Sequence, residues 1–293
     1  MASHVPSLRL YHRHVTGAAP RVDGNVPDGV SATTLWTLHN RASEAKRSDG
    51  VIRDPWAVTL FDAIDYDYRK FGKPNQSHAL RAVAFDTAAR EYLTAHPKAS
   101  VVALAEGLQT SFWRLQRHGV TDELTWYSVD LPPVMALRDK LLPHDDRIVP
   151  LAQSALDRSW MDRIDATHGV FITAEGLLMY LDPADALGLI GDCAARFPGG
   201  RLMFDSVPPW FSRRTVSGKL KLSDRYVAPP MPFALSPDEA VALAGRIPGV
   251  RAARDIAMPP GRGLFKVLAS PVWDRVGIVR RGRPSFTLLE FES

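Results

Sequence analysis

The sequence predicts an α/β fold in which helices cover both faces of a mostly parallel sheet. Two observations support this fold class. Short apolar runs rich in Val, Leu, Ile and Phe, which are typical of buried strands, recur along the chain. Segments with the spacing of amphipathic helices separate these runs, and such alternation indicates a parallel sheet.

The apolar runs place the strands. They are predicted at residues 100–104, 124–129, 147–151, 169–173 and 201–205, with a last strand at 285–291. Asp54-Pro55, Asp182-Pro183 and Ser236-Pro237 each open a helix, because Asp or Ser caps the first turn and Pro has no N–H to lose there.

Three helices are predicted before the first strand. The first begins at Thr33 with Ser31 as its cap, the second begins at Asp54-Pro55, and the third covers residues 74–96. We therefore interpret residues 31–98 as an N-terminal helical cap.

The remaining segments complete the predicted domain organisation. Residues 1–30 show no hydrophobic period and are expected to form a flexible arm, whereas residues 99–293 form the core. Within the core, residues 207–235 are rich in Pro, Arg, Ser and aromatic residues. We expect this segment to be an insertion that lies over the carboxyl edge of the sheet like a lid.

Composition excludes several classes of protein. Lys and Arg outnumber Asp and Glu by 36 to 32, a surplus too small to predict nucleic-acid binding. The single cysteine, Cys193, excludes an internal disulfide and a cysteine-based metal site, and we expect a buried structural thiol rather than a reactive one. No secretory signal is present, and no apolar stretch approaches the roughly 20 residues of a membrane span, so a cytoplasmic protein without a membrane partner is expected.

The candidate binding residues follow the predicted strands, because open parallel sheets bind ligands at the carboxyl ends of their strands. Gly107 follows the first strand, where a glycine lets a ligand approach the backbone, although a single glycine there is also typical of a plain strand-to-helix turn. Asp130 ends the second strand and can accept hydrogen bonds from both ribose hydroxyls of a nucleoside, or cap the next helix. Glu175 follows the fourth strand and can pair with a cationic amine, or form a surface salt bridge.

Several blocks of the chain carry a family resemblance. They are residues 36–45, Asp54-Pro55-Trp56-Ala57, the loop after the first strand, Ser128-Val129-Asp130-Leu131-Pro132 and, most specific of all, TAEGLLMYL at 173–181. Through these blocks the chain resembles the leucine carboxyl methyltransferase family, especially its branch of polyketide O-methyltransferases. The resemblance extends from Thr34 to the C-terminus.

The resemblance implies a Rossmann-like fold of the class I methyltransferases, with a seven-stranded, mostly parallel sheet. It implies S-adenosylmethionine (SAM) as methyl donor and S-adenosylhomocysteine as product. Arg81 matches the arginine that clasps the SAM carboxylate, and Glu175 matches the glutamate near the SAM amino group. Asp130 matches the ribose-binding acid. The full set of implied cofactor-binding residues is Arg81, Ala105, Glu106, Gly107, Asp130, Leu131, Ala155, Leu156 and Glu175.

The chain departs from the family pattern at three positions. Ala105 stands at the first glycine of a Gly-x-Gly loop, where a methyl group is unfavourable if φ is positive. Gln109 stands where relatives often have Asp, and Ala155 begins the adenine-binding pair where Asp is common. These departures motivate an alternative function, a protein that binds SAM or another ligand without catalysis.

We expect in-line methyl transfer to a carboxylate or hydroxyl of a small, aromatic, polyketide-like acceptor, a reaction that depends mainly on positioning. A carboxylate needs no base, whereas a phenol with a pKa of about 10 benefits from one. The candidate catalytic residues are Glu175 and Tyr180, and His78 is a further candidate base.

The acceptor pocket is predicted in the insertion. Trp210 and Tyr226 can stack on an aromatic acceptor, and Arg213 and Arg214 can hold an anionic one, unless these arginines are simply solvated. A second alternative function is an NAD-dependent oxidoreductase, although the G-x-G-x-x-G fingerprint is missing. The sequence leaves open whether the protein is a monomer or a homodimer.

Overall fold

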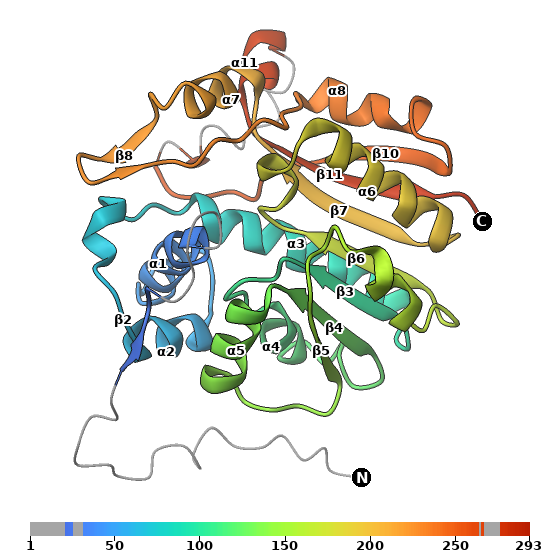
Figure 1. Cartoon of the computed structure of the whole chain (residues 1–293), viewed down its shortest axis with the longest axis horizontal. Coiled ribbons are helices and arrows are strands. Elements are labelled where there is room, and N and C mark those ends of the chain that lie inside the picture. Colours follow the sequence, from blue (N-terminus) through green and yellow to red (C-terminus); the bar gives the residue numbers. More distant parts are fainter. Residues whose placement is uncertain (1–20, 26–31, 264, 267–275) are drawn as a thin grey trace.

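The computed structural model describes residues 21–25, 32–263, 265–266 and 276–293. At its centre lies a seven-stranded sheet with the order β10-β11-β7-β6-β3-β4-β5 (Figure 1). The strands β3 to β7 are parallel, and β11 runs antiparallel to both of its neighbours. Their bounds are β3 (Ser100–Leu104), β4 (Thr125–Asp130), β5 (Ile148–Ala152), β6 (Val170–Ala174), β7 (Arg201–Ser206), β10 (Val250–Ile256) and β11 (Ser285–Phe291). The predicted Rossmann-like α/β fold is confirmed.

The sequence identifies every strand of this sheet except β10. The predicted bounds of β3 and β11 agree with the structure, and the other predicted strands begin or end one residue away from it. β10 escapes the prediction because its residues, VRAARDI, include two arginines and an aspartate. It can be this polar because it lies at the edge of the sheet and is paired on one side alone.

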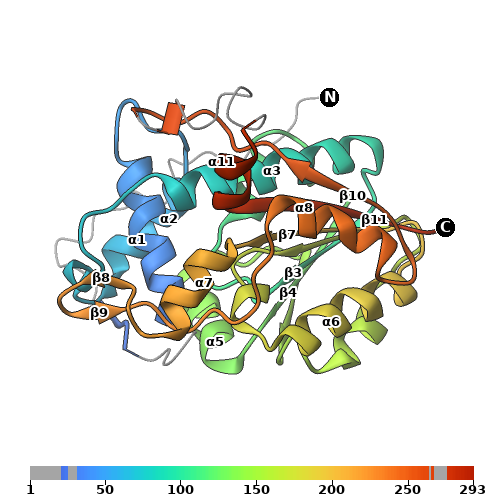
Figure 2. The ribbon, with the colours of Figure 1, turned by 90° about the horizontal axis from the view of Figure 1, so that it is seen from above.

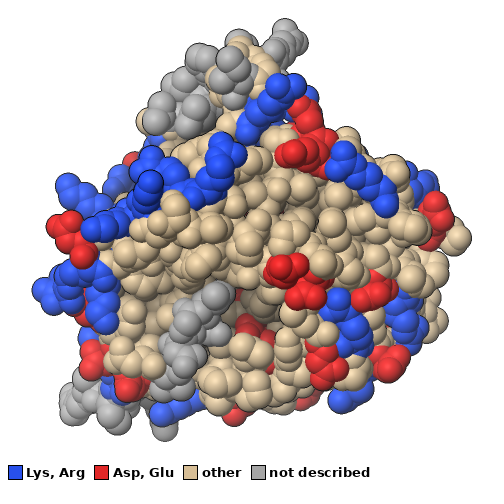
Figure 3. All heavy atoms as spheres, turned by 45° about the horizontal axis from the view of Figure 1, so that its top comes forward, with Lys and Arg blue, Asp and Glu red and all other residues tan. Residues whose placement is uncertain are grey.

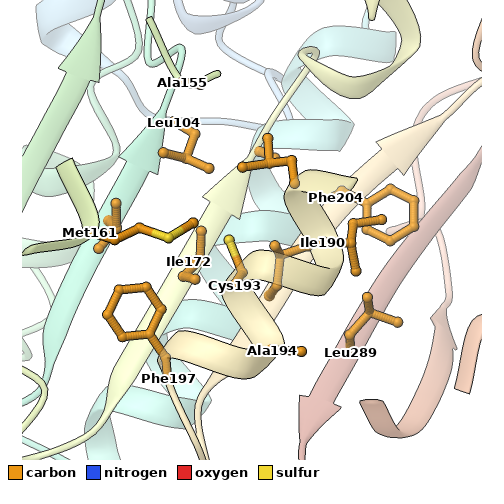
Figure 4. Close-up of a cluster of buried hydrophobic side chains, with 14 of the residues drawn as sticks. Leu104, Ala155, Met161, Ile172, Ile190, Cys193, Ala194, Phe197, Phe204 and Leu289 are labelled. Atoms are coloured by element: carbon orange, nitrogen blue, oxygen red, sulfur yellow. The ribbon is translucent and has the colours of Figure 1, made fainter. Parts of the chain in front are cut away.

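Helices cover both faces of the sheet because neighbouring strand residues point to opposite faces. Val102 and Leu104 of β3 belong to a buried cluster that includes Ile190 and Cys193 of helix α6 (Pro183–Arg196) (Figure 4). Cys193 is therefore the buried structural thiol that was expected.

Val101 and Ala103 point to the opposite face. They pack with side chains of α3 (Ser77–Ala95) and α4 (Ser111–Gln116). The remaining helix beside the parallel strands is α5 (Pro132–Leu141), and short 3-10 turns lie at η4 (Arg158–Arg163) and η5 (Leu178–Tyr180).

Side-chain caps start three helices as predicted. Asp54 accepts a hydrogen bond from the Ala57 N–H, Asp182 accepts one from the Ala184 N–H, and Ser236 forms a capping box with Glu239. The predicted cap of the first helix, Ser31, lies outside the described residues. Ala32, which precedes α1 (Thr33–Ala45), makes no side-chain cap bond.

The N-terminal helices lie beside the carboxyl edge of the sheet (Figure 1). They are α1, α2 (Pro55–Ala63) and α3. The short turn η3 (Tyr68–Phe71) lies between α2 and α3. In the described part of the expected arm, β1 (Val22–Asp23) pairs with β2 (Ile64–Asp65), and the rest of residues 1–30 falls outside the described ranges. None of the helices in the described ranges is long and apolar enough to cross a bilayer.

Residues 207–235 leave the sheet after β7 and return to it. Val207 and Ala234 form a bridge at the base of the segment, which contains α7 (Pro209–Val216) and the hairpin β8 (Lys221–Ser223) and β9 (Tyr226–Val227). From above, α7 and the hairpin extend from the sheet toward α1 (Figure 2). The chain then forms α8 (Pro237–Val241), η6 (Ala242–Gly245) and, before β11, α11 (Gly277–Gly282).

Candidate active site

A cavity of about 930 Å³ opens at the carboxyl ends of the parallel strands. Its wall includes the residues that follow β3, β4, β6 and β7, together with residues of α1, α3 and the segment 207–235. Strand order reverses between β3 and β6, and this switch point is where open α/β sheets bind their ligands. The face of the molecule above the sheet is largely uncharged and is hollowed below its centre (Figure 3).

The loop after β3 passes close to the cavity with a tightly specified backbone. Gly107 has φ +57°, and a Cβ added there would lie 2.5 Å from Thr34 Oγ1. Its N–H donates to Asp130 Oδ2 at 2.6 Å, and the next N–H, of Leu108, donates to Thr34 Oγ1 at 2.7 Å. Gly107 is therefore required by both conformation and space, so it is more than a plain turn residue.

Ala105 has the positive φ that is unfavourable for a residue with a side chain at this position of the loop. Its φ is +49°, and it is the one non-glycine residue with positive φ among the described residues. An L-residue in this region carries a strain of roughly 1–2 kcal/mol. The protein therefore holds this alanine in a conformation that glycine would adopt freely.

Two buried arginines hold the loop from below. Arg41 Nη2 donates to the Leu108 carbonyl at 2.7 Å, and Arg138 Nη1 donates to the carbonyls of Gly107 at 2.7 Å and Gln109 at 2.9 Å. These arginines were not predicted as site residues. The one available signal was that Arg41 lies in the family-like block 36–45.

Asp54 joins the loop supports to the second helix. Its carboxylate pairs with Arg41 at 3.0 Å and with Arg114 at 2.8 Å. Burial alone would raise the pKa of Asp54, but Arg114 and Arg41 more than offset it and hold that pKa well below its usual range. The cap residue of α2 thus also pairs with two buried arginines, one of which supports the loop after β3.

Asp130 lies at the end of β4 and faces the cavity. It accepts hydrogen bonds from the N–H groups of Gly107 and Leu131, the latter at 2.7 Å. The alternative of a helix cap is wrong, because the N-cap position of α5 is Leu131. Burial raises the pKa of Asp130, and the two N–H donors oppose that effect by favouring the ionised form.

Glu106 was predicted as a cofactor contact, and the structure gives its carboxylate internal partners instead. It pairs with Arg138 at 2.9 Å and accepts hydrogen bonds from Ser128 Oγ and from Trp126 Nε1, the latter at 3.3 Å. The residue lines the cavity, but its side chain is 2% exposed. The carboxylate therefore supports the loop from within the protein.

Two exposed leucines line the cavity wall. Leu131 and Leu156 line the cavity and are 41% and 37% exposed, which is unusual for large apolar residues. Ala155, beside Leu156, is buried and also lines the cavity. The backbone N–H of Leu156 donates to Ser154 Oγ at 3.1 Å, so that donor is already used within the protein.

Arg81 is the centre of an ion-pair cluster on the other side of the loop. Its Nε donates to Glu175 Oε1 at 2.9 Å, and its Nη1 donates to Asp205 Oδ2 at 3.0 Å. Gln109 Nε2 donates to the same Glu175 oxygen, and the Gly176 N–H donates to Asp205 Oδ1 at 2.6 Å. The side chain of Arg81 is 11% exposed and that of Glu175 is 8% exposed, so Glu175 does not form the surface salt bridge that was its alternative interpretation.

Asp205 is a further site residue that the sequence did not identify. It lies in β7, next to β6 in the sheet, and lines the cavity. A signal was present, because an acid at the carboxyl end of a predicted strand marks the same sheet edge as Asp130. Burial raises the pKa of Glu175, and Arg81 opposes this effect.

The predicted catalytic residue Tyr180 lies in the cavity wall, whereas the predicted acceptor residues do not. Tyr180 lines the cavity and is hydrogen bonded to Thr33, and burial raises its pKa. Tyr226, which was predicted to stack on the acceptor, is not in the cavity wall. It is half-buried and packs edge-on against Phe71, at a centroid distance of 4.8 Å.

Trp210, Arg213 and Arg214 are not in the cavity wall. The two arginines lie on the exposed side of α7, because Ser212 and Thr215 occupy its buried side. Trp210 is 45% exposed and donates from Nε1 to the Gly282 carbonyl at 2.9 Å. The structure thus places these three residues outside the cavity, in agreement with the alternative of a solvated arginine pair.

The residues of the cavity fit a nucleoside-containing cofactor such as SAM. The fit rests on a loop that a side chain at Gly107 would block, an acid at the end of β4, and two exposed leucines in the same cavity wall. This arrangement on this fold defines a SAM-dependent methyltransferase.

Comparison with known proteins gives the same class. The sequence profile of the leucine carboxyl methyltransferase family matches residues 34–194, so the chain belongs to this family. It is 32% identical to the tetracenomycin polyketide synthesis O-methyltransferase of Streptomyces glaucescens, over 87% of this chain and 92% of that protein. This family membership also argues against the alternative of an NAD-dependent oxidoreductase.

Two solved structures resemble the fold. One, from Thermobifida fusca and provisionally named a methyltransferase, has a TM-score of 0.54 at 18% identity and covers 74% of this chain and 82% of that one. The other, a DUF574 family protein from Streptomyces avermitilis, has a TM-score of 0.51 at 15% identity and covers 74% of this chain and 84% of that one. At these identities the likeness concerns the fold alone.

Proposed function

We propose that the protein is an O-methyltransferase for a carboxylate or hydroxyl group of a small aromatic, polyketide-like metabolite. The observation that carries this proposal is the apolar half of the cavity, which adjoins the cofactor loop. Its wall is contributed by α1, by residues 207–231 and by single residues near the C-terminal end. It includes Trp36, Phe211, Leu220, Leu222, Met231, Met258, Phe265 and Phe286. Such a wall suits an aromatic acceptor of low charge.

Charge distribution in the cavity supports the same acceptor class. The two arginines of the wall are already paired, Arg81 with two carboxylates and Arg283 with Asp255 at 2.5 Å. An acceptor with several negative charges would find little compensation here. The relative from Streptomyces glaucescens is named for tetracenomycin polyketide synthesis, and this name supports an aromatic polyketide as the acceptor class.

In this proposal the chain's residues bind and orient the reactants. Asp130 holds the ribose, Leu131 and Leu156 contact the adenine, and the cluster of Arg81 and Glu175 holds the amino-acid end of SAM. When bound, SAM supplies an electrophilic methyl group, so the transfer depends mainly on positioning. Tyr180 orients the acceptor rather than acting as its base, because burial raises its pKa. Residues 207–235 close over the acceptor as a lid.

The test is transfer of a labelled methyl group from SAM to aromatic probes such as 1-naphthoate, 2-naphthol and 3-hydroxy-2-naphthoate. Mild alkali cleaves a methyl ester but not an aryl ether, so the treated product shows which oxygen is methylated. We expect Phe211→Ala to raise the KM of an accepted probe roughly tenfold, because burial of an aromatic contact is worth about 1.5 kcal/mol or more. Transfer to none of the aromatic probes would contradict the proposal.

The double variant Arg213→Glu/Arg214→Glu is the matched control on the same helix. Both arginines are exposed and lie outside the cavity wall, so the charge reversal should leave the KM of the probe unchanged. A large rise in KM would return these arginines to the acceptor site.

A further inference from the structure

His78 lies on α3 in the wall of the cavity, three residues before Arg81. It is 9% exposed, and its ring meets Trp36 edge-on at a centroid distance of 4.7 Å and an interplanar angle of 83°. Packing against a large aromatic ring fixes the orientation of the imidazole. Its two nitrogens therefore have separate and constant surroundings.

A chain of hydrogen bonds determines which nitrogen carries the proton. The backbone N–H of Asn75 donates to Asn40 Oδ1 at 2.9 Å. A backbone N–H can only donate, so this contact fixes the orientation of the Asn40 amide. The Nδ2 end of the amide then lies 2.6 Å from His78 Nδ1. Because an amide NH₂ is only a donor, Nδ1 accepts, and a neutral ring must carry its proton on Nε2.

The surroundings of the ring keep it neutral. Burial lowers the pKa of His78 well below its ordinary value, and the cations Arg81 on α3 and Arg41 on α1 lower it further. The nearby carboxylates Glu175 and Asp205 are engaged by Arg81, and Asp54 is engaged by Arg41. Protonation of Nδ1 would also remove its bond with Asn40.

Nε2 has no hydrogen-bond partner within the described part of the chain, and the side chain lines the cavity. We propose that His78 is a positioning residue whose Nε2–H donates a hydrogen bond to an oxygen of the methyl acceptor, and that it is not a general base. This inference rests on the proposed function for its acceptor, but its hydrogen-bond geometry does not. An acceptor that suits this donor presents a charged or carbonyl oxygen toward α3.

The position of the proton is measured directly by a long-range ¹H–¹⁵N spectrum of the full protein labelled with ¹⁵N-histidine. The His78 signals are assigned by their loss in His78→Gln. We expect a protonated Nε2 and an unprotonated Nδ1 at pH 7. A proton on Nδ1, or a doubly protonated ring, would overturn the proposal. This readout needs no acceptor, so it does not depend on methyl transfer.

Steady-state kinetics with 3-hydroxy-2-naphthoate test the positioning role. His78→Leu removes the donor and should raise the KM of this probe about tenfold, while kcat changes less than about twofold and the pH profile keeps its shape. His78→Gln should restore most of the loss, because its amide N–H₂ extends toward the place of Nε2. A general base would instead show a large fall in kcat and a changed pH profile in both variants.

Asn40→Asp inverts the hydrogen bond while preserving the size of its partner. A carboxylate at this position must accept from Nδ1–H, so the pKa of His78 should rise and the spectrum should show a proton on Nδ1. An unchanged spectrum would mean that Asn40 does not set the tautomer. A complete lack of methyl transfer to aromatic probes would contradict the proposed function, whereas a wrong tautomer or an unchanged KM in His78→Leu contradicts this inference.

Discussion

Ala105→Gly should make the protein more stable, although it enlarges the conformational freedom of the unfolded chain. Ala105 has φ +49°, where an L-residue is strained by roughly 1–2 kcal/mol. Glycine removes this strain, and its greater entropy in the unfolded state offsets about 0.5–1 kcal/mol of the gain. The expected net gain in the free energy of unfolding is therefore about 0–1.5 kcal/mol, with a central value of about 0.8 kcal/mol.

Urea unfolding, followed by circular dichroism, measures this gain as a higher midpoint at constant slope. Gly119→Ala is the matched control, because Gly119 has φ +69° and a Cβ added there meets no atom within 4 Å. It should lower stability by a similar amount through backbone conformation alone. If Gly119→Ala destabilises the protein and Ala105→Gly does not stabilise it, the strain at Ala105 is refuted.

Two further predictions concern charged groups. Asp205→Asn removes one of the two carboxylates that orient Arg81 and should weaken SAM binding, measured by calorimetry, about tenfold. Asp192→Asn, in an exposed pair with Arg158, is the control and should leave the affinity unchanged. Equal affinity in both variants would remove Asp205 from the site. Stability should fall in acid, because the pKa of Asp54 is lower in the folded state than in the unfolded state. The contribution of Asp54 to the free energy of unfolding is therefore complete above the unfolded pKa of about 4, and it is lost as the pH falls through the folded pKa. Urea midpoints at pH 7, 5, 4 and 3 should therefore decrease below about pH 4, and less steeply in Asp54→Asn; parallel decreases would contradict this role of Asp54.

The sheet was predictable because its information is local. Each parallel strand is a short apolar run, and helix starts carry their own cap residues, as Asp54 and Asp182 show. β10 was not predictable, because an edge strand with arginines lacks the apolar run that identifies the other strands.

The candidate site was predictable where strands end in functional residues, as with Gly107, Asp130 and Glu175. The partners of these residues come from distant positions, and no local pattern announces them. Arg138 is 31 positions from Gly107, and Asp205 is 124 positions from Arg81. Arg213 and Arg214 were predicted in the site but lie outside the cavity wall. Composition indicated an insertion near the site, but it did not show which side of α7 is buried.

The most direct test of the account is calorimetric titration of the protein with SAM and S-adenosylhomocysteine, for the wild type and for Asp130→Ala. The account predicts micromolar binding of both compounds to the wild type, or roughly −8 kcal/mol. Loss of the carboxylate should weaken binding at least a hundredfold, because charge-assisted hydrogen bonds are worth about 1.5–3 kcal/mol each. Asp146→Ala, at a side chain 98% exposed, serves as the surface control. Absence of binding to the wild type, or equal binding to Asp130→Ala, would contradict the cofactor site described here.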